Sequence, residues 1–532
     1  MPSIKKLFVW FDDHILLVLA SFLFVFIPLY PKFPLFDIIP GYIVRVRLED
    51  FLVAATLLIW LVQVIRQKAK FHSLLLIPMV AYLVIGLLSM VSAVLLTHTV
   101  PMQFDHIGKM VLHWARRIEY FSLYFVFYSA VTSIRTVKRL MILFGLTAIA
   151  ATIYGIGQKL YQWPVYSTMN REFAKGWKLV LTEHARVPST FAGHYDFAAY
   201  LVLFLSISAA IFLFVKKEPV KVVSLFGFTA ALVSLVLTAS RASFIAYLIA
   251  ITVMLILFAL RRSWLWAAKR WVVLIAVSLV FSAAFGELAS RFSHFFNFAR
   301  ISGFIKYDVL KIQPAPEYLR LTDNLALVLT PSDTPPVPAG SSRRTDGELP
   351  PDVFEDIPDG LIATTSADGT ATISAQSRQY SDAAFTFGLS SAIRFDALWP
   401  RAIKGFLNNP LLGSGYSTLT KARITDFTEA ESTDNDFLRA LGETGLLGFL
   451  AFYGMIGYAL WYSWKNREYL RASFVYAVVV GIAAGTIGLL VNALYIDVFE
   501  ASKVAFMFWA LMGIFVATVE RISLRHQKRP AA

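Results

Sequence analysis

The sequence predicts an all-α, multi-pass membrane protein with about 12 transmembrane helices and a large external loop that holds a small β-hairpin. Composition is the first reason. The 532 residues are 57% hydrophobic but only 16% charged, whereas soluble domains usually carry about a quarter charged residues. The second reason is that the apolar residues gather into runs near the ~20 residues needed to cross a bilayer. Together these observations exclude an ordinary soluble domain.

The apolar runs follow one another along the chain, and one long polar interval separates the last three from the others. The first run is followed by Pro31, Pro34 and Pro40, so we expect its end to be irregular. It lacks a small-residue cleavage site, and we expect it to be retained. The runs are 15–30, 51–65, 74–96, 118–131, 141–160, 197–214, 222–238, 244–260, 271–285, 446–462, 474–494 and 504–519.

Lys and Arg mark every second connection between the runs, and both chain ends lie on the marked side. Basic connections stay in the cytoplasm. We therefore expect a protein of the cytoplasmic (inner) membrane with both termini cytoplasmic and the large loop external. The formal net charge of +14 reflects this topology and does not predict nucleic-acid binding. The clusters lie at 5–6, 66–70, 135–139, 216–221, 261–270, 465–471 and 521–529.

Three parts of the chain follow from this pattern. Residues 1–286 are expected to form an N-terminal transmembrane bundle, and 287–444 the large external loop. Residues 445–532 are expected to form the C-terminal transmembrane helices and a basic cytoplasmic tail. Within the loop, 317–382 is an acidic insertion, with eleven Asp and Glu against four Arg. Its segment 361–374 alternates around Ala-Asp-Gly and predicts the β-hairpin.

Two polar groups near predicted spans could carry chemistry. Arg241 stands between two apolar runs, where it either binds a phosphate through its planar guanidinium or extends to lipid headgroups. Arg186, His194 and Asp196 come just before another run. A His beside an Asp can do acid–base work. The alternative is a polar interfacial cap with Asp196 at a helix N-terminus. No cysteine is present, which excludes disulfides and thiolate chemistry.

The stretch 394–453 concentrates polar residues before a span. Its Gly413-Ser414-Gly415 predicts a turn with close backbone approach, but no Lys-Ser/Thr follows to make a P-loop. We expect Ser432 or Asp434 to cap the next helix. Arg394, Arg401 and Glu443 flank the same interval, and glycines around Glu443 permit close helix contact. A last polar group is expected to be a solvated loop: Asn492, Asp497, Glu500 and Lys503.

Four ordered motifs resemble the O-antigen ligase/polymerase family of multi-spanning membrane glycosyltransferases. They are STFAGHYDFAAYL, TASRAS, RFDALWPRAIKGFLNNPLLGSGYS and DNDFLRALGETGLLGFL. The resemblance covers the chain from about Arg186 onward, without the insertion 317–382. It implies a metal-independent enzyme with no cofactor. It also implies a glycan donor carried on a polyprenyl diphosphate such as undecaprenyl diphosphate, a glycan or lipid-linked acceptor, a membrane-lipid environment, and flippase and chain-length regulator partners.

The resemblance also assigns roles to residues. Arg241 and Arg394 match the family's loop arginines that engage the diphosphate. Ligases place a His-Asn pair where this chain has Asp434-Asn435. This difference favours a polymerase-like enzyme, with Asp434 or His194 as the base. The expected catalytic residues are Arg241, Arg394, Asp434 and His194, and the expected substrate-binding residues are Arg186, Asp196, Arg401, Gly415, Asn435 and Glu443.

Three other functions remain open. One is an O-antigen ligase that transfers the glycan to a lipid or protein acceptor. Another is a flippase or transporter for the same lipid-linked glycan, although such proteins often show two matching halves and charges at mid-membrane, which are not evident here. The third is a non-catalytic scaffold that uses the acidic loop as a binding surface. A reaction with purified protein and lipid-linked oligosaccharide distinguishes them.

Overall fold

A computed structural model gives the structure of the chain. Contacts divide it into two compact units, Met1–Phe285 with Leu398–Ala532, and Gly286–Ala397. The residues that the structure describes are 4–39, 45–168, 173–182, 185–284, 360–365, 371–376, 381, 384, 388–421, 432–470 and 472–527.

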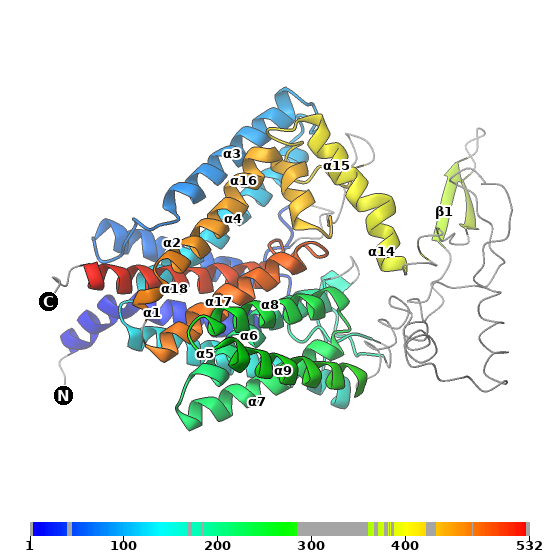
Figure 1. The fold of residues 1–532 in the computed structure, drawn as a ribbon. Helices are drawn as coiled ribbons and strands as arrows, with labels where there is room; N and C mark the ends of the chain where they lie inside the picture. Colours follow the sequence, from blue (N-terminus) through cyan, green and yellow to red (C-terminus); the bar gives the residue numbers. More distant parts are fainter. Residues whose placement is uncertain are drawn as a thin grey trace, which may run out of the picture. The chain divides into compact units, whose positions relative to one another are not determined.

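Long helices make up most of the first unit (Figure 1). They form where the sequence has long apolar runs, because a helix satisfies its own backbone hydrogen bonds in lipid. In the N-terminal part these helices are α1 (Ile4–Leu29), α2 (Leu48–Ile65), α3 (Leu76–Leu95), α4 (Phe104–Ala130), α5 (Ile134–Tyr161), α6 (His194–Phe214), α7 (Glu218–Leu237), α8 (Arg241–Ala259) and α9 (Trp264–Ala284).

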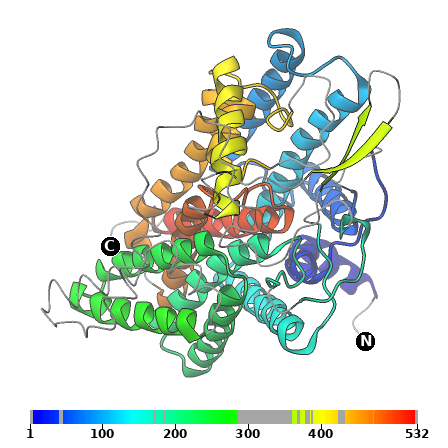
Figure 2. The same ribbon diagram turned by 90° about the vertical axis from the view of Figure 1, so that its right-hand side faces the viewer.

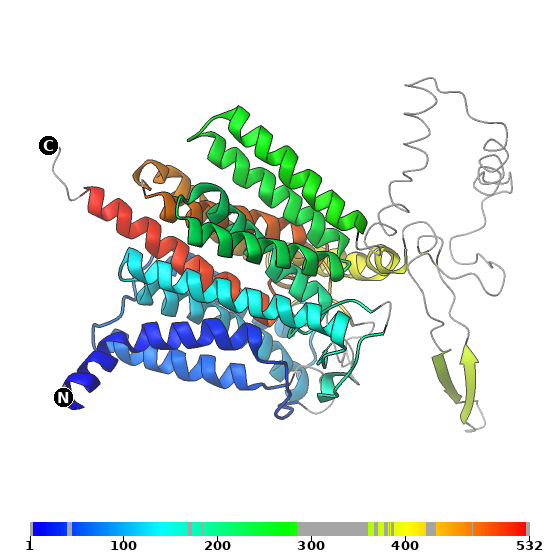
Figure 3. The ribbon, with the colours of Figure 1, turned by 90° about the horizontal axis from the view of Figure 1, so that it is seen from below.

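The C-terminal helices complete this bundle. They are α15 (Trp399–Asn408), α16 (Asp436–Lys465), α17 (Ser473–Asn492) and α18 (Ser502–Gln527). The apolar stretch of α18 is completely buried, and α18 packs against α4, α6 and α17 (Figure 3). The core of the unit therefore lies around α18. The short helix α15 packs along α16 (Figure 2).

Among the described residues, eleven helices are long and apolar enough to cross a membrane. This confirms the coarse prediction of a helical, multi-pass membrane protein. The remaining predicted run, 118–131, lies in α4. The 27 residues of α4 include five charged side chains, so α4 is not one of the eleven helices that are apolar enough to cross a membrane. α1 begins and α18 ends at the same end of the bundle (Figures 1 and 3).

The second unit contains β1 (Gly360–Thr365) and β2 (Ala371–Gln376), which pair antiparallel with Leu361 opposite Ala375. These strands occupy the segment for which the sequence predicts a hairpin. The unit also contains α14 (Leu389–Ile393), which continues into a π-helical turn at Arg394–Leu398. Apart from the two strands and Ser381, the acidic insertion 317–382 lies outside the described residues.

The predicted glycine turn packs tightly on α16. Backbone N–H groups of Ser414 and Gly415 donate to the carbonyls of Gly442 and Glu443 at 2.8 and 3.0 Å. Gly413 has φ +70°, and a Cβ there would lie 2.5 Å from the carbonyl carbon of Glu443. The prediction of close backbone approach is confirmed. The contact fixes the first turns of α16, which carry the charged residues described next.

Candidate functional site

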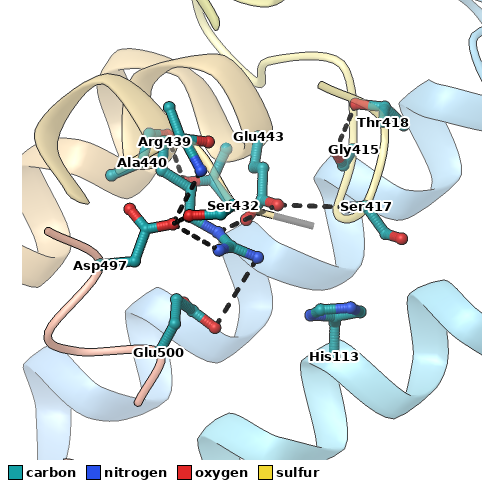
Figure 4. Close-up of polar contacts among 12 residues, drawn as sticks. His113, Gly415, Ser417, Thr418, Ser432, Arg439, Ala440, Glu443, Asp497 and Glu500 are labelled. Carbon is teal, nitrogen blue, oxygen red and sulfur yellow. Dashed lines mark hydrogen bonds and ion pairs between the residues drawn. The ribbon is translucent and has the colours of Figure 1, made fainter. Parts of the chain in front are cut away.

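A buried cluster of charged side chains forms where α4 and α16 meet the connection between α17 and α18. Arg439 of α16 is at its centre (Figure 4). Its guanidinium lies 3.1 Å from the carboxylate of Asp497, 3.4 Å from that of Glu443 and 3.9 Å from that of Glu500. The Arg439 side chain is only 5% exposed. One cation therefore lies close to three carboxylates, each of which would be costly to bury alone.

A second arginine joins the cluster from α4. Arg117 forms an ion pair with Glu500 and lies 3.8 Å from the Glu443 carboxylate. Its guanidinium stands 5.0 Å over the ring of Tyr416, in the loop that precedes α16. Glu443 also accepts a hydrogen bond from the backbone N–H of Ser417 at 3.1 Å (Figure 4). The cluster thus ties the loop to α4, to α16 and to the connection between α17 and α18.

Asp497 fixes the position of the segment that contains Asp434, one of the two predicted bases. Its carboxylate accepts backbone hydrogen bonds from Thr433 and Asn435, at 2.8 and 2.9 Å. The side chain of Asn435 accepts from the N–H of Leu438 and is the N-cap of α16. The prediction that Ser432 or Asp434 caps this helix is therefore wrong: the Ser432 hydroxyl instead donates to Asp434 and to Asp497.

The expectation of a solvated loop for the group around Asn492 is also wrong. Asn492 is completely buried and exchanges hydrogen bonds with Ser243 of α8. Lys503 is 1% exposed, and its ammonium donates to the carbonyls of Pro28, Tyr30 and Thr190. Charged residues between two spans look the same in a sequence whether the connection faces water or packs inward.

A cavity of about 470 Å³ lies beside the cluster and shares Arg439 and Glu500 with it. Its lining also includes His113 and the aromatic residues Phe36 and Phe51. Cations outnumber carboxylates in the lining. The cations are Lys32, Arg45, Arg47, Arg116 and Arg439; the carboxylates are Asp50, Glu119 and Glu500. Such a lining favours an anionic ligand larger than a single water.

Ion pairs hold some of these cations in place. Arg116 lies 2.5 Å from the Asp50 carboxylate and 2.9 Å from that of Glu119. Arg47 is buried and lies 3.9 Å from the Glu49 carboxylate. Fixed guanidinium groups lose little freedom when a phosphate binds to them, which increases their affinity for it.

Lys32 is a titratable member of the lining. Its ammonium donates to the hydroxyl of Ser502 at 2.9 Å. Burial, reinforced by the nearby charge of Arg47, lowers the pKa of Lys32 to about 8, while the charge of Asp196 acts in the opposite direction. Lys32 is therefore a cation near neutral pH and loses its charge as the pH rises through 8.

The predicted group before α6 is partly assembled near this cavity. Arg186 donates to the ring Nε2 of His194 at 2.9 Å and to the hydroxyl of Tyr195 at 3.3 Å. His194 is buried at the first position of α6, after the N-cap Gly193. Asp196 is in the same first turn and acts electrostatically on Lys32. Arg186 and His194 are thus in contact, Asp196 lies in the same helical turn as His194, and the role of all three remains a prediction.

The other predicted residues lie in several places. Arg241 is the half-buried first residue of α8. Arg394 belongs to the second unit and donates to the carbonyl and hydroxyl oxygens of Ser390. That Arg241 and Arg394 engage the diphosphate remains a prediction. Arg401 is exposed and donates to the Thr420 carbonyl. Of the predicted binding residues, Glu443 is inside the charged cluster. The backbone N–H of Gly415 donates a hydrogen bond to the Glu443 carbonyl.

Sequence reasoning missed Arg117 and Arg439 of the cluster, and most of the cavity cations. One signal could have found part of them: α4 carries Arg116, Arg117 and Glu119 at the start of an otherwise apolar run. Charged side chains so placed usually face a partner or a water-filled cavity. Within the described part of the chain, no group of three or more His, Asp and Glu is close enough to hold a metal ion.

The helices and the buried charges define a multi-pass membrane protein with a polar site embedded among its helices. Residues 226–453 match the family model described as O-antigen ligase. This match, over somewhat less than half of the chain, supports the O-antigen ligase/polymerase family that the motifs resemble. It includes Arg439 and Glu443. No curated protein matches the chain.

Proposed function

We propose that the protein is a membrane glycosyltransferase that polymerises or transfers oligosaccharides carried on a polyprenyl diphosphate. The cation-lined cavity is the observation that carries this proposal. When a glycosyl diphosphate reacts, negative charge develops on the departing diphosphate. Fixed cations stabilise that charge most where water is scarce. The family match is independent support.

Besides the cavity, the proposed reaction needs an acceptor hydroxyl and a base. A hydroxyl of the acceptor attacks the anomeric carbon, the bond from that carbon to the diphosphate oxygen breaks, and the diphosphate leaves with the electron pair. A base takes the hydroxyl proton. Asp434 and His194 remain proposed bases, and His113 is a further candidate because it lines the cavity.

The predicted topology agrees with a site at the outer face of the inner membrane. Apart from Arg439 of α16, the cavity residues come from the connections 31–50, 97–117, 161–196 and 492–503, or from residues close to them. The Lys and Arg pattern assigns all four connections to the outside. A lipid-linked donor delivered there by a flippase would present its diphosphate at that level. Asp434, in place of the ligase histidine, favours polymerisation over transfer to a lipid or protein acceptor.

Reconstitution tests the proposal. The purified protein is placed in vesicles with a polyprenyl-diphosphate-linked oligosaccharide, and products are resolved by length. Longer glycans are expected, or glycans joined to an added acceptor if the enzyme is a ligase. Movement of the donor across the vesicle with no new glycosidic bond would establish a flippase and overturn the proposal.

Replacing Arg241 or Arg394 with Ala is expected to abolish product formation. Each side chain matches a family arginine that engages the diphosphate, and loss of such a donor costs about 100-fold or more in rate. Membrane insertion is expected to be normal, which is checked by the protease-protection pattern of the expressed chain. Full activity in both variants would contradict this assignment of the diphosphate contacts.

Donor affinity is expected to fall as the pH rises from 7 to 9. Lys32 loses its charge near pH 8, and the lost attraction to a diphosphate should weaken binding roughly tenfold. A disubstituted diphosphate keeps its charge over this range. The groups that act on Lys32 are Arg47, Arg116, Glu49 and Asp196.

The Lys32→Gln variant is the matched control for this pH dependence. It should bind the donor weakly at every pH, with an affinity that falls much less between pH 7 and 9 than that of wild type. Binding is measured by fluorescence titration in nanodiscs. The same pH dependence in wild type and in Lys32→Gln would show that another group is responsible.

A further inference from the structure

A second cavity lies on the outer surface of the helix bundle, far from the cation-lined cavity beside Arg439, which we name the charged cavity. It has a volume of about 350 Å³ and is walled by α5, α6 and α7, with Phe474 of α17 at one side. Apart from Ser208 and Ser224, its lining residues are apolar. Ile142, Leu146 and Val223 at its rim are 54–60% exposed. We name this cavity the apolar groove.

Basic side chains gather at one end of the apolar groove. Lys138 is one helical turn before Ile142 on the same face of α5, and its ammonium lies 5.7 Å from the ring centroid of Phe474. Lys216 and Lys217 are exposed in the connection that enters α7, and Lys221 is in its first turn. Glu218, which pairs with Lys221, is the one acidic residue in the segments 135–142 and 214–224.

The apolar groove and the charged cavity lie toward opposite ends of α6. The start of α6 is near the charged cavity, where Asp196 acts on Lys32. Ile207, Ser208 and Ile211 of the groove are 13 residues or more further along α6 than His194, which corresponds to roughly 20 Å. By the predicted topology this end is cytoplasmic.

We propose that the apolar groove binds an anionic phospholipid of the cytoplasmic leaflet. One acyl chain would fill the groove, and the phosphate headgroup would lie among Lys138, Lys216 and Lys217. The charge at the groove end decides the class of ligand, because basic pockets between membrane helices on the cytoplasmic side bind anionic headgroups. The prenyl tail of a donor whose diphosphate lies in the charged cavity would start from the opposite end of α6. This inference does not depend on the proposed enzymatic function.

Lipid analysis of the purified protein tests the proposal. The chain is extracted in a mild detergent, and co-purified lipids are quantified by mass spectrometry per mole of protein. Wild type is expected to retain phosphatidylglycerol or cardiolipin in preference to phosphatidylethanolamine. Gly145→Leu places a side chain in the groove and should reduce the retained anionic lipid about tenfold. A Cβ at Gly145 meets no atom within 4 Å, so the fold should tolerate it.

Two matched controls accompany this experiment. Gly454 of α16 also has open space around its Cβ, and Gly454→Leu should retain lipid as wild type does. The double variant with Lys138→Gln and Lys217→Gln should lose anionic lipid. Its control is Lys465→Gln, at another basic connection, which should retain it. Equal retention in Gly145→Leu and Gly454→Leu would overturn the proposal. So would a bound lipid that is neutral or is a polyprenyl phosphate.

Discussion

Replacing Arg47 with Gln is expected to lower the rate of product formation by about 100-fold or more, because a fixed charge would be missing where the diphosphate leaves. Arg47 lines the charged cavity and is 7% exposed. Its planar guanidinium can donate two parallel hydrogen bonds to a phosphate, and few water molecules compete for them at a buried position. The initial rate of glycan elongation by the reconstituted protein is the measurement.

A double variant separates lost chemistry from lost folding. Glu49 is 1% exposed and lies 3.9 Å from Arg47, so the single substitution leaves a buried carboxylate without its cation. Arg47→Gln with Glu49→Gln removes both charges and should restore the thermal stability that the single substitution costs. The double variant is nevertheless expected to stay inactive. A double variant that unfolds at the wild-type temperature and works at the wild-type rate would contradict an anion-binding role for Arg47.

The helices of this protein could be predicted well from composition alone. The apolar run 197–214 corresponds to α6 (His194–Phe214), and 474–494 to α17 (Ser473–Asn492). A membrane span must satisfy every backbone hydrogen bond internally, so length and hydrophobicity nearly determine the structure. α4 is the exception: its buried charges shorten the apolar run, although the helix itself extends for 27 residues.

The charged cavity could not be predicted in the same way. Lys32, Arg47, Arg116 and Arg439 are far apart in the sequence, and only the packing of α1, α2, α4 and α16 brings them to one cavity. Each of them alone resembles an ordinary interfacial cation. Motif resemblance gave residues on the matched part of the chain, such as Glu443, but not the cations on α4 and before α2, which precede that part.

The identity of a helix cap shows a smaller limit of the same kind. Ser432, Asp434 and Asn435 are all good N-cap residues and are adjacent in the sequence. Which one caps α16 depends on Asp497, a residue on a distant connection whose carboxylate accepts the N–H groups of Thr433 and Asn435. Asp434 takes a left-handed conformation, with φ 50°. Local preference predicted the cap type, and a tertiary contact selected the residue.

Replacing Arg439 with Met is expected to lower the free energy of unfolding by about 3–5 kcal/mol, the usual cost of removing one partner from a buried ion pair. Met has a similar volume and keeps the packing, so the loss is electrostatic. Two arginines, Arg117 and Arg439, serve three carboxylates in this cluster, those of Glu443, Asp497 and Glu500. The measurement is chemical unfolding in detergent micelles, and Arg401→Met, at an exposed position, is the matched control.

Removing one carboxylate as well should restore part of the stability. In Arg439→Met with Asp497→Asn the cluster loses one charge of each sign, and the amide oxygen of Asn can still accept the backbone N–H of Thr433 or Asn435. We expect the double variant to recover a substantial part of the lost free energy, because the two side chains interact directly at 3.1 Å. If the effects of the two substitutions simply add, the 3.1 Å contact contributes nothing to stability. The cluster would then be held by helix packing, with its charges compensated elsewhere.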